Sequence, residues 1–208
     1  MQITTAALTT GFFLLFLSTI GSAQDRMPPI PRDKMTDAQK KAEAELVSGP
    51  RGSLFGPFIP LLRSPEFMTR LQKAGEYLRF QNAIGQRLTE FVILLTARQW
   101  TQQYEYDVHM PLALQAGMKQ EILDAIAAGR RPVGMSADEE ITYDFFIELR
   151  QYQSVTDATY ARTVARFGEQ GVIDMTGLIG YYTTLAMIMN VARTPVPDNR
   201  QPLPPLPR

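Results

Sequence analysis

The chain has 208 residues, of which 45% are hydrophobic and 20% charged, and its formal net charge at pH 7 is zero. This composition is typical of a globular protein, and the length fits one domain. Zero net charge gives no argument for binding nucleic acid or an anionic membrane surface. The chain contains no cysteine, which excludes disulfides and every thiol mechanism.

Residues 1–23 have the pattern of an export signal. An apolar run at 6–20 is followed by Gly21-Ser22-Ala23, small residues typical of a signal-peptidase site. The run is shorter than the ~20 apolar residues that span a bilayer, although an uncleaved N-terminal anchor is the alternative. We therefore expect an exported protein, periplasmic or secreted, whose mature chain begins at Gln24.

Residues 24–63 are predicted to hold one surface helix and a loop rich in proline and glycine. Thr36 and Gln39 form a capping-box pattern at the start of a mostly polar helix. Glycines and prolines between Gly49 and Pro60 then predict a loop. Because this loop is also apolar, it either packs on its own core or forms a wall of a substrate pocket.

Residues 64–197 show the signals of successive helices, so the predicted fold class is all-α, an antiparallel helical bundle. No segment shows the sustained alternation between turns that marks β-hairpins. The first of these helices begins at Ser64-Pro65 and is predicted to turn Phe67, Leu71, Ala74 and Leu78 toward the core. Further helices are predicted at 87–100, 102–117, 119–128, 136–152, 154–167 and 169–193. Residues 198–208 form a Pro-rich tail that we expect to be extended.

The last predicted helix is long enough to span a bilayer. It also contains Thr183, Thr184 and Asn190, and such polar residues are unusual in a membrane span. We therefore predict a buried central helix and no stable membrane span after removal of the signal.

Three ionisable residues predict an acid–base site: Glu90, Glu105 and His109, the only histidine of the chain. On a helix, Gln102, Glu105 and His109 share one face because they recur at i, i+3 and i+7. A chain reversal near Thr101 brings Glu90 back against them. The residues predicted to bind substrate beside these three catalytic candidates are Gln102, Tyr104, Tyr181, Tyr182 and Arg98.

A structural role for this histidine is the alternative to a catalytic one. A buried Glu90 needs a partner in either case, and the imidazole and Arg98 are both candidates. The three side chains offer one nitrogen ligand only, so we predict no metal site.

The order Glu90-x14-Glu105-x3-His109, followed by PLALQAG at Pro111–Gly117, resembles the carboxymuconolactone decarboxylase family. That family includes the alkyl hydroperoxidase D peroxidases, and the resemblance covers about residues 66–197. It implies an antiparallel all-α fold and assembly into homo-oligomers, trimers or hexamers. The cysteine pair of the peroxidases would fall at Gln102 and Glu105, and neither residue forms a thiolate. We therefore expect no thiol peroxidase activity.

The decarboxylase branch implies a lyase that needs no cofactor. Its substrate loses a carboxylate as carbon dioxide, and the enzyme stabilises the resulting oxyanion and protonates carbon. The resemblance implies that His109 donates this proton while Glu105 or Glu90 fixes its tautomer. The expected partner is a small-molecule acid or lactone, or a keto acid. The alternative is a non-catalytic exported helical oligomer that binds a small ligand in the same pocket.

Overall fold

The computed structural model describes residues 24–196 and 202–204, and all regular secondary structure within them is helical. The predicted all-α class is therefore confirmed. The predicted signal peptide, residues 1–23, lies outside the described residues, as does most of the Pro-rich tail. The elements are the 3₁₀ turn η1 (Arg32–Lys34) and the helices α1 (Asp37–Ser48), α2 (Phe58–Leu61), α3 (Pro65–Phe80), α4 (Gln86–Gln99), α5 (Gln103–Gln115), α6 (Gln120–Ala127), α7 (Ala137–Tyr152) and α8 (Asp157–Ala192).

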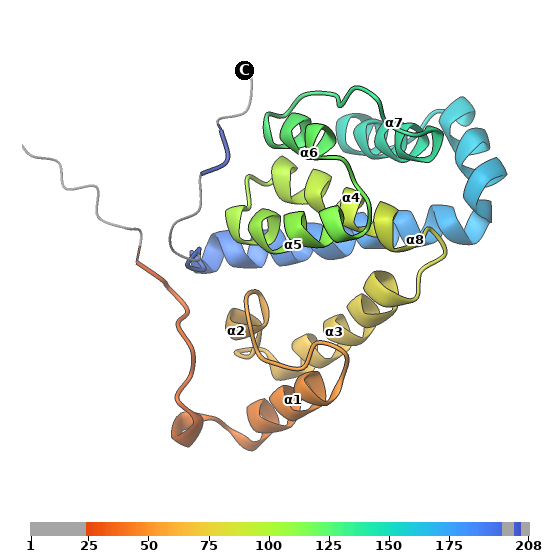
Figure 1. Cartoon of the computed structure of the whole chain (residues 1–208). Coiled ribbons are helices and arrows are strands. Elements are labelled where there is room, and N and C mark those ends of the chain that lie inside the picture. Colours follow the sequence, from red (N-terminus) through yellow and green to blue (C-terminus); the bar gives the residue numbers. More distant parts are fainter. Residues whose placement is uncertain (1–23, 197–201, 205–208) are drawn as a thin grey trace, which may run out of the picture.

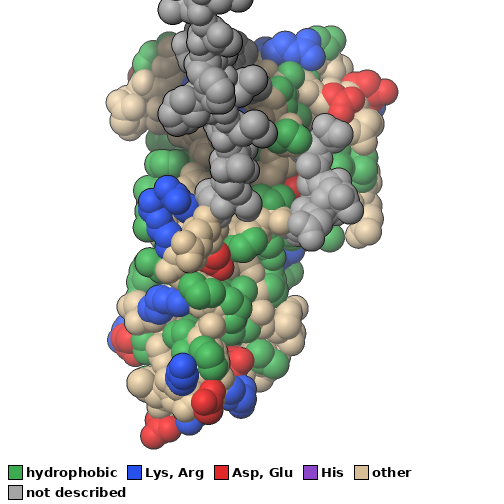
Figure 2. Space-filling view, turned by 90° about the vertical axis from the view of Figure 1, so that its left-hand side faces the viewer, with side chains coloured by type: hydrophobic (Ala, Val, Ile, Leu, Met, Phe, Trp, Pro, Cys, Tyr) green, Lys and Arg blue, Asp and Glu red, His purple; other side chains and the backbone are tan. Residues whose placement is uncertain are grey.

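Helix α8 crosses the middle of the molecule and separates two groups of helices (Figure 1). Helices α4–α7 lie on one side of it and α1–α3 on the other. Helix α4 contacts both groups, because it packs against α5, α6 and α7 as well as against α8 and α3. On the face shown in Figure 2, acidic and basic side chains are interspersed, as the zero net charge leads one to expect.

Helix α4 is buried on all sides, since every residue from Leu88 to Arg98 is buried. Val92 and Ile93 pack into the apolar cluster shared with α1–α3 and α8, while Phe91 and Leu94 pack into the cluster shared with α5–α7. This arrangement also takes the carboxylate of Glu90 into the interior, where a charge is costly unless it is paired.

Local sequence signals set most of the helix boundaries. The predicted capping boxes form at Thr36 and at Ser136, each with a reciprocal hydrogen bond to the residue three positions later. Gly168 has φ 70° and ψ 172°, so α8 consists of two helical segments that meet where the two predicted helices adjoin. Helix α5 continues through Pro111, and the short helix α2 lies in the segment predicted to be a loop.

Helix α3 is held against α8 by a buried carboxylate. Asp174 of α8 accepts hydrogen bonds from the Tyr77 hydroxyl at 3.1 Å and from the Ala83 backbone N–H at 2.8 Å. Half of the predicted inward face of α3 is confirmed, because Leu71 and Leu78 pack against the apolar core. Phe67, which is 45% exposed, and Ala74 were predicted wrongly, since both lie at the surface. The fully buried positions of α3 are Met68, Gln72 and Gly75.

Helix α8 is the one helix within the described residues that is long and apolar enough to cross a membrane. Half of the residues in its most apolar 18-residue window are buried inside the structure. The packing of α8 against α3, α4 and α7 accounts for that burial. The absence of a membrane span in the mature chain stays a prediction.

Close packing of α3 on α8 generates a test of this arrangement. A Cβ atom on Gly75 would lie 2.0 Å from Cζ of the buried Tyr181 ring. We expect Gly75→Ala to lower the free energy of unfolding by ~1–3 kcal/mol, because the rigid ring must move. Gly180→Ala is the matched control in α8. Nothing lies within 4 Å of its added Cβ, so it should stabilise by ~0.5–1 kcal/mol. Urea denaturation of both variants measures this, and an equal response would contradict the packing.

Candidate active site

A tight reversal of the chain between α4 and α5 creates the site. Thr101 adopts the left-handed conformation, with φ 46°, at the position where the sequence predicted a reversal. Gln102 then caps α5 by accepting a hydrogen bond from the Glu105 N–H at 3.3 Å. As a result α5 runs back along α4, and His109 comes to face Glu90.

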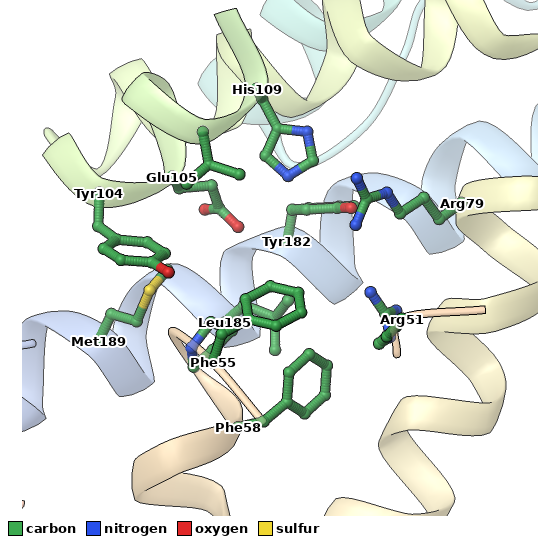
Figure 3. A pocket seen from close by; sticks show the side chains of 12 residues that line it. Arg51, Phe55, Phe58, Arg79, Tyr104, Glu105, His109, Tyr182, Leu185 and Met189 are labelled. Atoms are coloured by element: carbon green, nitrogen blue, oxygen red, sulfur yellow. The ribbon is translucent and has the colours of Figure 1, made fainter. Parts of the chain in front are cut away.

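Glu90 and His109 form a buried hydrogen bond, with 2.6 Å between Oε2 and Nδ1. Glu90 also accepts a hydrogen bond from Gln86 Nε2 at 2.7 Å, so both of its oxygens are satisfied. A carboxylate acceptor places the imidazole proton on Nδ1 and leaves the lone pair on Nε2. Figure 3 shows that second ring nitrogen directed into a cavity, with the His109 ring edge-on to Tyr182 at 5.3 Å between centroids.

The cavity lies where α5, α8, the end of α3 and the loop before α2 meet (Figure 3). It contains about 310 Å³ of space between atoms, measured out to its open mouth. The cavity is narrow: its volume in the usual measure is about 20 Å³, little more than one water molecule needs. Its walls are formed by Arg51, Phe55, Pro57, Phe58, Arg79, Tyr104, Glu105, Val108, His109, Tyr182, Leu185 and Met189.

Burial shifts the two proton-carrying groups of the cavity toward their uncharged forms. Desolvation lowers the pKa of His109, although its hydrogen bond to Glu90 acts in the opposite direction. Desolvation likewise raises the pKa of Glu105 well above 4.5, against the attraction of Arg79. Glu105 Oε2 is buried and has no hydrogen-bond partner. These shifts suit the imidazole to accept a proton and Glu105 to donate one, whereas the resemblance implies that His109 is the donor.

Two arginines that the sequence did not single out complete the cavity. Within the described residues neither Arg51 nor Arg79 forms an ion pair, and the Nε atom of each is buried without a hydrogen-bond partner. Arg51 is oriented by a hydrogen bond to the Tyr181 hydroxyl at 3.0 Å and by stacking on Phe58, 4.8 Å from the ring centroid. The only feature of the sequence that pointed to Arg51 was the apolar loop between Gly49 and Pro60, which we considered as a wall of a substrate pocket. Two unpaired guanidinium groups make the cavity suited to an anion.

The structure brings some predicted substrate-binding residues to the cavity and not others. Tyr104 and Tyr182 line it. Tyr181 does not line it; its ring lies edge-on to Tyr182, and its hydroxyl accepts a hydrogen bond from Arg51. Gln102 does not line the cavity, because its Nε2 donates a hydrogen bond to Oδ1 of Asn190 at 2.9 Å.

Arg98 was also placed wrongly. Its guanidinium donates to the Pro204 carbonyl and borders a separate cavity formed with α6 and α7. Glu90 is thus paired with the imidazole and not with Arg98. Among the described residues, no three His, Asp or Glu side chains lie close enough to hold a metal ion.

A scan against models of known protein families finds no match, and a search of curated proteins finds no significant match either. The resemblance carried by Glu90, Glu105 and His109 therefore stays a prediction.

The unpaired carboxyl of Glu105 predicts a pH-dependent stability. The folded protein holds the Glu105 proton more tightly than the unfolded chain does, so this group weakens the fold progressively as pH rises above 4.5. Glu105→Gln removes the titration. Its free energy of unfolding relative to the native chain should increase between pH 5 and pH 8, by ~1–3 kcal/mol.

Urea denaturation at the two pH values measures this difference. The control Glu140→Gln changes an exposed carboxyl, and its effect should stay within ~0.5 kcal/mol at both. A Glu105→Gln effect that is the same at pH 5 and pH 8 would contradict the assigned protonation.

Proposed function

We propose that the protein is a cofactor-free lyase of the carboxymuconolactone decarboxylase type, which acts by proton transfer on a small lactone or keto acid. One observation carries the proposal. The free Nε2 of His109, the carboxyl of Glu105 and two unpaired arginines face a single cavity. A proton acceptor, a proton donor and an anion-binding pair are the parts that such a reaction needs.

The arginines support a substrate that carries a carboxylate. A guanidinium group binds a carboxylate through two parallel hydrogen bonds. Arg79 lines the cavity, and its guanidinium lies at the hydroxyl end of Tyr182 (Figure 3). The apolar side chains of Phe55, Leu185 and Met189 would hold the remainder of a small ring. Net positive charge in the cavity would also stabilise the enolate oxygen that forms during the reaction.

The proton steps follow from the protonation of the two groups. When the substrate carboxylate leaves as carbon dioxide, the electrons of the broken carbon–carbon bond pass to the conjugated carbonyl and form an enolate. Glu105 then delivers its proton to carbon and is reprotonated from solvent. With a keto acid, His109 Nε2 removes a proton beside the carbonyl and Glu105 protonates the oxygen. Glu90 stabilises the imidazolium that this step produces.

The cavity must widen before it can admit a substrate or any other small ligand, so both candidate functions require a movement. A ligand larger than water requires at least one wall of the cavity to move outward, and we propose that this is the loop that carries Arg51 and Phe55. This loop has two glycines with positive φ, Gly52 and Gly56, which permit turns that other residues resist. The same movement would serve a non-catalytic ligand-binding protein, which is the alternative function. We also propose that the chain has the antiparallel helical bundle of this family, that it assembles into trimers or hexamers, and that it is exported.

Hydrogen exchange tests the proposal before the substrate is known. We expect the mature protein to catalyse the exchange of protons beside the carbonyl of small 2-oxo acids in D₂O, followed by proton NMR. His109→Gln should lower this rate by ~10²–10⁴, because it removes the proton acceptor while an amide can still bond Glu90. Glu105→Gln should lower it too, since the acid is lost.

Release of carbon dioxide from a panel of small lactones and keto acids tests the lyase step with the same variants. Glu140→Gln again serves as the control and should retain full activity. Exchange that is unchanged in His109→Gln would sink the proposal. Carboxylate binding without exchange or carbon dioxide release would favour the non-catalytic alternative.

A further inference from the structure

Three residues of the C-terminal tail lie on the far side of α5 from the cavity wall, against a second surface. The backbone N–H of Leu203 donates to Gln103 Oε1 at 2.6 Å, and the carbonyl of Pro204 accepts from the guanidinium of Arg98. The Leu203 side chain packs against the apolar cluster of α4–α7. The rest of the protein therefore contacts this short segment through a side chain, a backbone N–H and a backbone carbonyl.

The surface is a groove between α5 and α6. Beside residues 202–204, which form part of its lining, its cavity volume is about 420 Å³, so space remains next to the segment that it holds. Tyr106 is rigid at its floor, because its hydroxyl donates to the Leu123 carbonyl at 2.7 Å. The residues that line the groove are Gln103, Tyr106, Asp107, Met110, Gln120, Leu123, Asp124 and Ala127.

These contacts suit the chemistry of a proline-rich segment. Proline has no N–H, so in Pro202-Leu203-Pro204 only Leu203 has an N–H to donate, and Gln103 accepts it. Proline also pre-orders the extended conformation, which lowers the entropy lost on binding. In the sequence, the triplet Pro-Leu-Pro occurs twice in succession, at 202–204 and 205–207, between Arg200 and Arg208.

The charges of the groove and of the segment are complementary. Asp107 and Asp124 are the two charged residues among those that line the groove, and both are acidic. Arg98, which contacts Pro204 through its guanidinium, is the nearby basic residue. The arginines at 200 and 208 give the proline-rich segment a positive charge at each end. Opposite charges at the rim favour encounter and fix orientation more than they add affinity.

We propose that the groove between α5 and α6 is a receptor for proline-rich segments in which a leucine lies between prolines and arginines flank the motif. Residues 202–204 of the protein's own tail occupy part of this receptor and mask it. A partner presents the same chemistry on an exposed segment and binds by displacing the tail. The proposal is independent of the chemistry at His109.

A labelled peptide tests the receptor in the full mature chain. The peptide QPLPPLPR, with a fluorescent label, is titrated with the native protein and with Leu203→Asp, and binding is followed by anisotropy. Leu203→Asp should release the groove, because a carboxylate cannot pack against its apolar floor. We expect the peptide to bind this variant with one-to-one stoichiometry and at least tenfold more tightly than it binds the native chain. The peptide QPSPPSPR should bind neither protein.

A second substitution locates the binding. Adding Gln103→Ala to Leu203→Asp should weaken binding several-fold, while adding Gln153→Ala, outside the groove, should not. If Leu203→Asp loses helicity by circular dichroism, Leu203→Ala takes its place with the same expectations. Equal binding of both peptides, or no binding to either released variant, would overturn the proposal. Concentration-dependent dimerisation of the native chain that Leu203→Asp abolishes would overturn it as well, since it assigns the groove to the tail of a second copy.

Discussion

The hydrogen bond between Glu90 and His109 is the constraint on which the rest of the structure depends. Glu90 lies in the most buried helix of the described chain and has no contact with water. Removing the partner of such a charge typically costs ~3–5 kcal/mol, so the imidazole ties α5 to α4. The same bond decides which nitrogen of His109 carries the proton. One interaction thereby links the packing of two helices to the chemistry of the cavity.

The tyrosines of α8 and the two arginines of the cavity surround the bond between Glu90 and His109. Helix α8 presents Tyr182 to the imidazole and Tyr181 to Arg51, and Tyr181 has room for its ring only because α3 carries Gly75 there. The same burial that keeps water away moves the protons of His109 and Glu105 toward the uncharged forms. Arg51 and Arg79 line the cavity without forming an ion pair within the described residues, and this supports the proposal that it binds an anion.

The sequence predicted those features that depend on local spacing. Capping boxes, the break at Gly168 and the shared face of Glu105 and His109 are all set by residues within two turns of one another. Glu90 could be placed because the predicted chain reversal near Thr101 brings it back against the next helix, where a buried carboxylate finds the partner it needs. Arg51 and Arg79 could not, because their approach depends on how α1–α3 pack against α8, and Arg98 was misplaced because its side chain leaves α4 on the opposite side.

The central claim is that Glu90 holds His109 as a neutral imidazole with Nε2 free in an anion-binding cavity. Since His109 is the only histidine, nitrogen NMR of the ¹⁵N-labelled protein observes this ring alone. The account predicts a proton on Nδ1, a titration that lies below pH 6.5, and an Nε2 resonance that shifts when a small carboxylate is added. A proton on Nε2 at neutral pH, or a ring that titrates above 6.5 and does not respond to carboxylates, would contradict it.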